Sequence, residues 1–174
     1  EDADLRTNSA TVAWARSLAV RGRSAKVDVI VPYTWLSGQA LFDGEVRQRD
    51  VSGFADPRFR YSVNFYGAPA LSFEEFSGFK QDVIVGASLQ VSVPVGQYDD
   101  TRLVNIGTNR WAFKPELGIS KAWGQWIVDI AAAVALYTDN TDFLDGGTVS
   151  QEPIYALQAH LVRGFSSGIW MALD

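Results

Sequence analysis

The feature that most constrains this chain is a long alternation of apolar and small or polar residues over positions 81–95. The odd positions carry the apolar set: Val83, Val85, Ala87, Leu89, Val91, Val93 and Val95. The even positions carry mainly small or polar residues: Asp82, Gly86, Ser88, Gln90 and Ser92. Because successive side chains of a β-strand point to opposite faces, this pattern predicts a strand with one apolar and one polar face. Its length also matches the roughly 10 residues that a tilted strand needs to cross a bilayer.

Similar alternation recurs along the chain and predicts eight strands in all. They cover residues 9–20, 23–35, 57–66, 81–95, 110–122, 126–137, 154–162 and 169–174. Short turns join some of these strands, whereas long polar segments at 36–56, 96–109 and 138–153 join others. Outer-membrane barrels show the same alternation, with short periplasmic turns and long external loops. The sequence therefore predicts an all-β, antiparallel, up-and-down transmembrane β-barrel.

The connection at 67–80 is an exception, because it falls where a short periplasmic turn is expected. Ser72 and Glu75 have the spacing of a helix capping box, and Phe73 and Phe76 lie on one side of a single turn. Two interpretations stay open. The segment forms a short interfacial helix, or it is an irregular loop with its aromatic side chains tucked under the barrel.

Alternation alone does not separate a membrane barrel from a soluble, calycin-like barrel that binds an apolar ligand inside. The polar positions are rich in Ala, Gly and Ser, whereas a surface in water carries roughly 25–35% charged residues. Large aromatic residues gather near the ends of the apolar faces, where interfacial girdles lie: Tyr33, Trp35, Phe59, Trp111, Trp126 and Tyr155. Both observations favour the membrane barrel. No apolar run reaches the 18 or so residues of a transmembrane helix.

Composition limits the partners. The chain has 174 residues, which suits one domain, and its formal net charge of −5 argues against nucleic acid. The absence of cysteine excludes disulfides and thiolate metal sites, and we expect no cofactor.

The rules of barrel topology predict further strands. Single-chain bacterial barrels have an even strand number and both termini in the periplasm. If the turn at Arg21 and Gly22 is periplasmic, the first strand begins outside. We therefore expect residues 1–174 to be a single β-barrel domain truncated at both ends. The complete barrel would have ten to twelve strands or more.

Several segments resemble one known family. They are residues 53–58, 64–71, 84–89, 94–99, 103–110, 113–118 and 137–140. These segments look like the MetA-pathway of phenol degradation family, and the block 105–118 is the most specific. The resemblance implies a bacterial outer-membrane barrel that is associated with the degradation of aromatic compounds and is thought to pass hydrophobic substrates. It carries over no catalytic residues.

The polar faces of the predicted strands supply candidate lumen and selectivity residues. They are Lys26, Asp28, Arg58, Arg60, Asn64, Asp82, Gln90, Lys114, Glu116, Asp129, Gln158 and His160. One hypothesis is that Arg58 and Arg60 form a basic ladder that faces acidic residues across the pore and fixes its charge. The alternative is that these charges pair in the interior and only stabilise the wall.

Two motifs invite other functions. His160 could meet Asp129 and a serine, as in outer-membrane hydrolases, but no nucleophile motif surrounds any serine, so we expect no enzyme. Asp139, Asp142 and Asp145 lack the spacing of a calcium loop. They predict a hydrated external loop and no dedicated metal site, and weak binding of divalent cations beside lipopolysaccharide stays open as an alternative.

The leading hypothesis is a passive channel or transporter of the bacterial outer membrane for small hydrophobic compounds, including aromatic ones. Its partners would be membrane lipid, lipopolysaccharide and the solute. The alternatives are a non-transporting barrel with a structural or adhesive role and the soluble, ligand-binding barrel. The sequence does not predict the substrate, the pore size or the oligomeric state.

Overall fold

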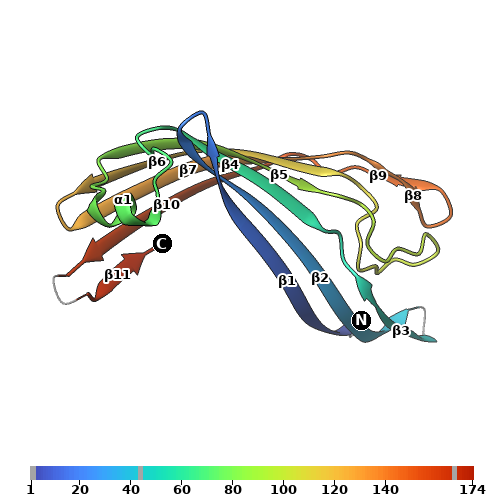
Figure 1. The fold of residues 1–174 in the computed structure, drawn as a ribbon. Helices are drawn as coiled ribbons and strands as arrows, with labels where there is room; N and C mark the ends of the chain where they lie inside the picture. Colours follow the sequence, from blue (N-terminus) through green and yellow to red (C-terminus); the bar gives the residue numbers. More distant parts are fainter. Residues whose placement is uncertain (1–2, 43–44, 166–167) are drawn as a thin grey trace.

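The computed structural model describes residues 3–42, 45–165 and 168–174, and most of them belong to one antiparallel sheet that curls into an open half-barrel (Figure 1). The strands of this sheet are β1 (Ala3–Val20), β2 (Arg23–Phe42), β3 (Glu45–Phe54), β4 (Arg58–Tyr66), β5 (Val83–Ser92), β6 (Ala112–Trp123), β7 (Trp126–Tyr137), β10 (Ile154–Gly164) and β11 (Trp170–Leu173). A separate hairpin contains β8 (Asn140–Phe143) and β9 (Gly147–Val149), and α1 (Phe73–Gly78) is the helix of the 67–80 connection.

The predicted up-and-down, all-β fold is confirmed. The strand order is β1-β2-β4-β5-β6-β7-β10-β11, so each of the eight predicted strands pairs with the next along the chain. β3 lies beyond β4 on the same edge of β2. Arg21 and Gly22 make the two-residue turn between β1 and β2 with φ of 50° and 75°, a turn whose twist suits a hairpin. Within the described residues the sheet is open between β1 and β11.

The prediction of a long polar loop at 36–56 is wrong in part. β2 continues to Phe42, and β3 pairs with it from Tyr33↔Phe54 outward. The segment 138–153 likewise contains the β8–β9 hairpin. These extensions carry polar side chains on both faces, so they lack the alternation by which the other strands were recognised. Backbone hydrogen bonds to the neighbouring strand hold them instead.

The register places the small and polar positions of adjacent strands side by side. One row across the sheet contains Ser17, Lys26, Ser62, Ser88, Glu116, Ala133 and Ala156. Along β6 the two faces differ in exposure, because Phe113, Leu117 and Ile119 are exposed whereas Lys114 and Glu116 are partly covered. A curled sheet covers its inner side more than its outer side. The polar rows therefore line the concave face, and the apolar rows cover the convex face.

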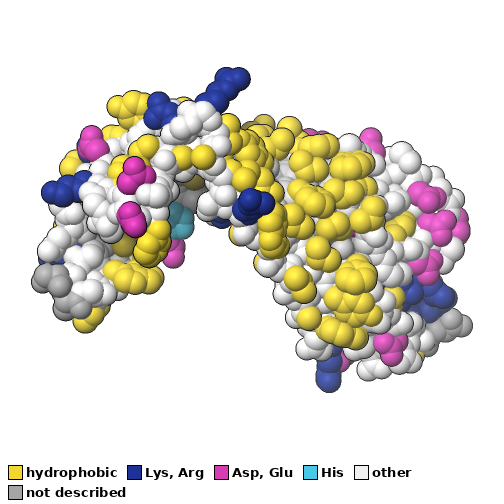
Figure 2. Space-filling model, viewed as in Figure 1, with side chains coloured by type: hydrophobic (Ala, Val, Ile, Leu, Met, Phe, Trp, Pro, Cys, Tyr) yellow, Lys and Arg dark blue, Asp and Glu magenta, His cyan; other side chains and the backbone are white. Residues whose placement is uncertain are grey.

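The sheet has no apolar interior. Among the described residues the buried apolar side chains are Ala25, Leu36 and Ala68, and no large side chain is fully buried. Leu89 is 45% exposed and Leu117 is 62% exposed. Hydrophobic side chains gather on the outer surface over β1, β2 and β4 (Figure 2). A soluble barrel would hold such side chains inside, so this distribution argues against the soluble, ligand-binding alternative.

The connection at 67–80 contains the predicted short helix. Ser72 Oγ accepts a hydrogen bond from the Glu75 amide (3.3 Å), and Glu75 Oε2 accepts one from the Ser72 amide (2.8 Å), which completes the capping box. Phe73 and Phe76 are 94% and 67% exposed, so they are not tucked under the sheet. No helix in the described part of the chain is long and apolar enough to span a membrane.

Candidate functional site

The concave face has a shallow hollow at its centre, where β4, β5, β6 and β7 contribute their polar rows. The polar side chains around it are Arg60, Ser62, Asn64, Ser88, Glu116, Ser120 and Asp129. Gly86 and Gly118 face each other across β5 and β6 and leave room in the middle of the hollow. Four of the twelve predicted lumen residues line this hollow: Arg60, Asn64, Glu116 and Asp129.

Glu116 is the centre of the charge cluster in the hollow. Its Oε1 lies 2.6 Å from the Arg60 guanidinium, and its Oε2 lies 3.8 Å from the Lys114 ammonium. Arg60 also donates to Ser88 Oγ at 3.2 Å. The Glu116 side chain is only 17% exposed, whereas those of Arg60 and Lys114 are 40% and 37% exposed. One carboxylate therefore pairs with two cations, so the cluster of Arg60, Lys114 and Glu116 has a net positive charge.

A second ion pair joins Lys26 and Asp28, whose charged atoms are 3.1 Å apart. Asp28 lies opposite Arg60 in the register of β2 and β4, and Gln90 lies between Arg60 and Lys114. One carboxylate oxygen of Asp28 is buried without a hydrogen-bond partner. The row Asp28–Arg60–Gln90–Lys114 thus forms a polar belt across four strands.

The predicted lumen residues outside the Glu116 charge cluster are spread along the concave face or lie off it. Asn64 donates to Ser24 Oγ at 2.9 Å, and Gln158 lies opposite Ala131 in the register. His160 pairs in register with Asp129 and contacts the Asp174 carboxylate.

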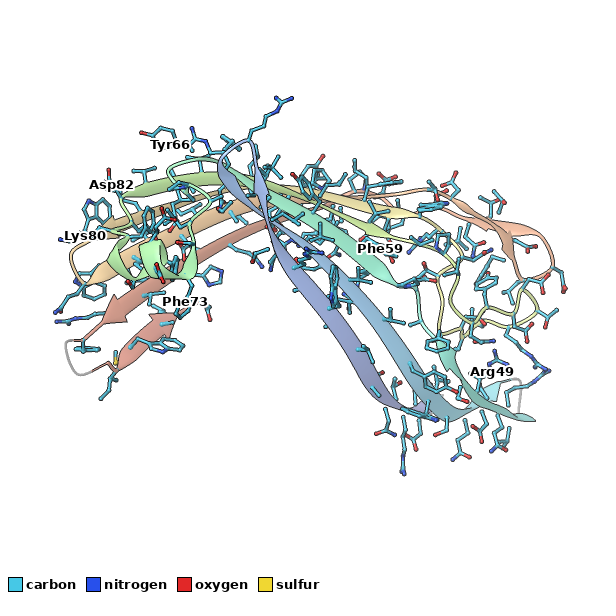
Figure 3. All side chains as sticks on the ribbon, viewed as in Figure 1. Arg49, Phe59, Tyr66, Phe73, Lys80 and Asp82 are labelled. Atoms are coloured by element: carbon cyan, nitrogen blue, oxygen red, sulfur yellow. The ribbon has the colours of Figure 1, made fainter. Side chains whose placement is uncertain are left out.

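Asp82 and Arg58 do not join the central cluster. The Asp82 carboxylate is 80% exposed and pairs with Lys121, a residue of the convex face, at the end of the sheet where α1 lies (Figure 3). Arg58 is exposed, and no ion pair to it is found within the described residues. The acidic partner of Arg60 lies two strands away on the same wall. For Arg60 this is the pairing that the wall-stabilising interpretation expects.

A polar cluster that was not predicted from the sequence lies around the segment 96–109 between β5 and β6. Asp56, only 8% exposed, accepts hydrogen bonds from the Gly96 amide (2.9 Å), the Thr108 amide (2.8 Å) and the Thr108 hydroxyl (2.7 Å). Asp56 is not among the site residues that the sequence predicts. A Cβ on Gly96 would lie 2.7 Å from the Asp56 carboxylate, so this glycine allows the close approach of the two segments.

Arg49 of β3 and Asn105 hold the middle of the same segment. Arg49 Nε donates to the Val104 carbonyl at 3.2 Å, and its guanidinium lies 3.6 Å from the Asp99 carboxylate. Asn105 accepts from the Asp99 amide (3.0 Å) and donates to the carbonyls of Asp99 and Arg102 (2.9 Å each). Hydrogen bonds therefore join the residues of the segment to one another and also join the segment to β3.

Asn140 fastens the segment to the β8–β9 hairpin. It is 4% exposed, accepts a hydrogen bond from Asn109 (2.9 Å) and donates to the Tyr98 hydroxyl (2.7 Å). That hydroxyl donates in turn to the Asp142 carbonyl at 2.9 Å. In the described residues no three carboxylate or histidine groups converge as metal ligands.

We predict that Asp56→Ala loosens the segment 96–109. The change leaves two part-buried amides and one hydroxyl without their acceptor, and an unsatisfied donor costs at most about 1–3 kcal/mol, the value for a fully buried one. Limited proteolysis of the intact protein should therefore cut within 96–109 far faster than in the wild type. Asp139→Ala is the matched control, because Asp139 is an exposed acid in the connection between β7 and β8. Equal cleavage rates in all three proteins would contradict the anchoring role.

Acid should loosen the same segment. The pKa of the Asp99 carboxyl lies below its usual 3.8, mainly because the Thr101 hydroxyl donates to it, with Arg49 and Arg102 adding to the effect. A carboxyl whose pKa is lowered by folding contributes stability above pH 3.8 and loses it as the pH falls through the lower, folded value. Cleavage by pepsin within 96–109 should therefore rise steeply below about pH 3.8. Asp99→Asn should flatten that rise, and an equally steep rise in this variant would refute the assignment.

Comparison with known proteins agrees with this architecture. The profile of the family described as "Putative MetA-pathway of phenol degradation" matches residues 1–172. No curated protein sequence matches the chain. Among solved structures, the chain is similar to the COG4313 outer membrane channel from Pseudomonas putida F1, with a TM-score of 0.73 and 21% identity. The match covers 98% of this chain but 60% of that one, so the chain spans less than two thirds of its length.

Proposed function

The chain belongs to the MetA-pathway of phenol degradation family, and from this premise we propose that it forms part of the wall of a bacterial outer-membrane channel. The channel lets small hydrophobic compounds, including aromatic ones, cross by passive diffusion. One observation carries the proposal: the apolar side chains lie exposed on the convex face while the polar ones line a hollowed concave face. This is the arrangement of a barrel in lipid with a wet interior.

Aromatic side chains at both ends of the strands support a position within a bilayer. At one end, Tyr33 packs against Trp35 and Phe54, with ring centroids 4.8 and 5.2 Å apart. At the other end, Trp123 and Trp126 lie opposite each other in the register. Such amphipathic rings suit the two membrane–water interfaces, where one side of a ring is apolar and the other is wet.

The composition of the concave wall supports a hydrophobic solute. Charged groups gather on β2, β4 and β6, whereas one stretch of β7 and the adjoining part of β10 present small, uncharged side chains to the concave face: Ala131, Ala133, Ala135 and Ala156. Asp129 and His160 lie beyond the end of this stretch. A solute can slide along this alanine-lined part without desolvating a charge, and such desolvation is costly. The charged belt on the other side keeps the channel hydrated.

Reconstitution of the full-length protein into liposomes tests the proposal. Small aromatic solutes should enter loaded vesicles faster than sugars of similar size, and planar bilayers should show discrete conductance steps. Vesicles without protein and vesicles with an unrelated closed barrel are the controls. A folded protein that gives neither conductance nor solute entry would instead support the non-transporting, structural or adhesive role.

A further inference from the structure

We infer that Arg163 and the aromatic rings around it bind the phosphate group of an anionic phospholipid on the periplasmic side of the convex face. We call the four residues Trp123, Trp126, Arg163 and Phe165 the headgroup site. The inference goes beyond transport, because it assigns a lipid partner to one place on the outer surface. It rests on one part of the proposed function, the position of the sheet in a bilayer, and not on the passage of solutes.

The strand register places the headgroup site on the convex face. Trp123 of β6 lies opposite Trp126 of β7, and Trp126 lies opposite Arg163 of β10. Residues that lie opposite each other in an antiparallel pair share a face of the sheet. Ile119 is exposed on the convex face of β6, and an even number of residues separates it from Trp123. All three paired side chains therefore lie on the side that contacts lipid.

The headgroup site lies at the end of the sheet that carries the short turns. β6 ends at Trp123 and β7 begins at Trp126. One row further in, Lys121 pairs with Asp82, which lies at the end of the sheet opposite to Arg49 (Figure 3). The Arg49 end carries the long connections (Figure 1). Because outer-membrane barrels place their short turns in the periplasm, the site faces the periplasmic leaflet of the bilayer.

Two rings hold the guanidinium of Arg163. Its Cζ lies 4.9 Å from the centroid of the Trp126 ring and 4.9 Å from the centroid of the Phe165 ring. The Gly164 amide donates a hydrogen bond to the Gln125 carbonyl at 2.8 Å, which fixes the backbone next to both rings. A ring attracts a cation without taking up the strong hydrogen-bond donors of a guanidinium. The rings therefore position Arg163 and leave its donors available.

The charge of Arg163 has no partner in the described part of the chain. Within residues 3–42, 45–165 and 168–174 no carboxylate lies within ion-pair distance of its guanidinium, and no side-chain hydrogen bond of Arg163 is found. Lys121, a cation one row further in, is by contrast neutralised by Asp82. A guanidinium presents its N–H donors in a planar fork that matches a phosphate. Arg163 is therefore a preformed and unoccupied anion-binding group.

The surroundings of Arg163 select a phospholipid over a free anion. Met171 lies opposite Arg163 in the register and is 63% exposed, and Leu161, one row further in, is 38% exposed. Acyl chains can cover these side chains while the phosphate contacts the guanidinium. Trp123 is 60% exposed and adds an amphipathic ring of the kind found at the level of lipid headgroups. A free phosphate would gain none of these apolar contacts.

The headgroup of this lipid should carry a net negative charge. A zwitterionic headgroup already has a cation beside its phosphate, whereas an anionic one gains its counter-charge from the protein. Anionic lipids attract basic groups at a membrane surface for this reason. We therefore expect phosphatidylglycerol to bind more tightly than phosphatidylcholine, although both carry the same phosphodiester.

Native mass spectrometry of the full-length protein in detergent tests the site, with phosphatidylglycerol, phosphatidylcholine and inorganic phosphate as the probes. We expect the wild type to retain phosphatidylglycerol in preference to phosphatidylcholine. Arg163→Gln should weaken this binding about tenfold or more, as expected for the loss of a hydrogen bond to a charged group. Arg21→Gln is the matched control, because Arg21 is an exposed cation in a turn at the same end and no ring contact to it is found within the described residues.

Two further variants separate a built site from a charged surface. Arg163→Lys keeps the charge but loses the planar fork, so its binding should lie between that of the wild type and that of Arg163→Gln. Trp126→Leu and Phe165→Leu, made singly, keep an apolar side chain and remove one ring. Each should weaken binding about two- to fivefold. Heat-dependent migration in gels with dodecyl sulfate shows whether each variant is folded.

The outcomes separate the headgroup site from the channel. Equal retention of phosphatidylglycerol by folded Arg163→Gln and the wild type would overturn the site, and so would an equal loss in Arg21→Gln or full retention by Arg163→Lys. Displacement of the lipid by an equal concentration of inorganic phosphate would overturn the assignment to a lipid. Each of these results in a conducting protein leaves the channel intact. A full-length protein that stays in solution without detergent would overturn the position in the bilayer itself.

Discussion

Leu89→Arg is expected to lower the free energy of unfolding of the membrane-embedded protein by about 2–4 kcal/mol, the cost of arginine on the lipid face of a barrel near the bilayer midplane. Leu89 lies in the middle of β5 on the convex face, is 45% exposed, and has Tyr61 and Pro115 beside it in the register. A guanidinium there would have to enter hydrocarbon. Urea unfolding of the intact protein in lipid vesicles measures the effect.

Ser88→Arg is the matched control, one residue away at the same depth but on the concave face. Its guanidinium would point into the hollow, where Ser88 Oγ already lies 3.5 Å from the Glu116 carboxylate. We expect a loss much smaller than that of Leu89→Arg. If Ser88→Arg were the more damaging of the two, the assignment of the faces would be inverted.

Glu116→Gln is expected to shift the ion selectivity of the channel toward anions. The change removes the one carboxylate that Arg60 and Lys114 share, so both cations then face the lumen without that partner. A unit charge about 4 Å from a passing ion contributes about 1 kcal/mol in water, which is roughly a fivefold rise for anions and a roughly fivefold fall for cations. The reversal potential of single channels in a salt gradient measures the shift.

Arg60→Ala provides the opposite change and should shift selectivity toward cations, while the double variant should return close to the wild type. The cost in stability of each single change should stay below the about 3–5 kcal/mol of a fully buried pair, because Arg60 is 40% exposed and solvent screens it. Identical reversal potentials in all these proteins would show that the charges only stabilise the wall, as the alternative hypothesis holds.

The fold was predictable from the sequence wherever one face of a strand differs from the other. β7 was predicted at 126–137 and observed at Trp126–Tyr137, and β6 differs from its prediction by no more than two residues at either end. A strand that contacts lipid on one face and water on the other must alternate between apolar and polar residues. That alternation is visible in the sequence and locates the strand. The capping box of α1 was predictable for a similar reason, because its contacts span three residues.

The remaining features depend on contacts between distant residues, which the alternation does not encode. β3 and the β8–β9 hairpin carry polar residues on both faces, so nothing in their pattern marks them as strands. The pairing of Arg60 with Glu116 follows from the register of three strands and joins residues 56 positions apart. Asp56 holds Thr108 across 52 positions, and its only local signal was its place in a segment that resembles the family.

The account depends most on lipid contacting the convex face of the sheet and water contacting the concave one. Single cysteines placed along β6 at 113, 114, 116, 117, 118 and 119 in the intact protein, spin-labelled and reconstituted in lipid, test this directly. We predict that labels at 113, 117 and 119 respond to a lipid-soluble relaxation agent and labels at 114, 116 and 118 to a water-soluble one. The reversed pattern, or uniform accessibility along the strand, would contradict the account.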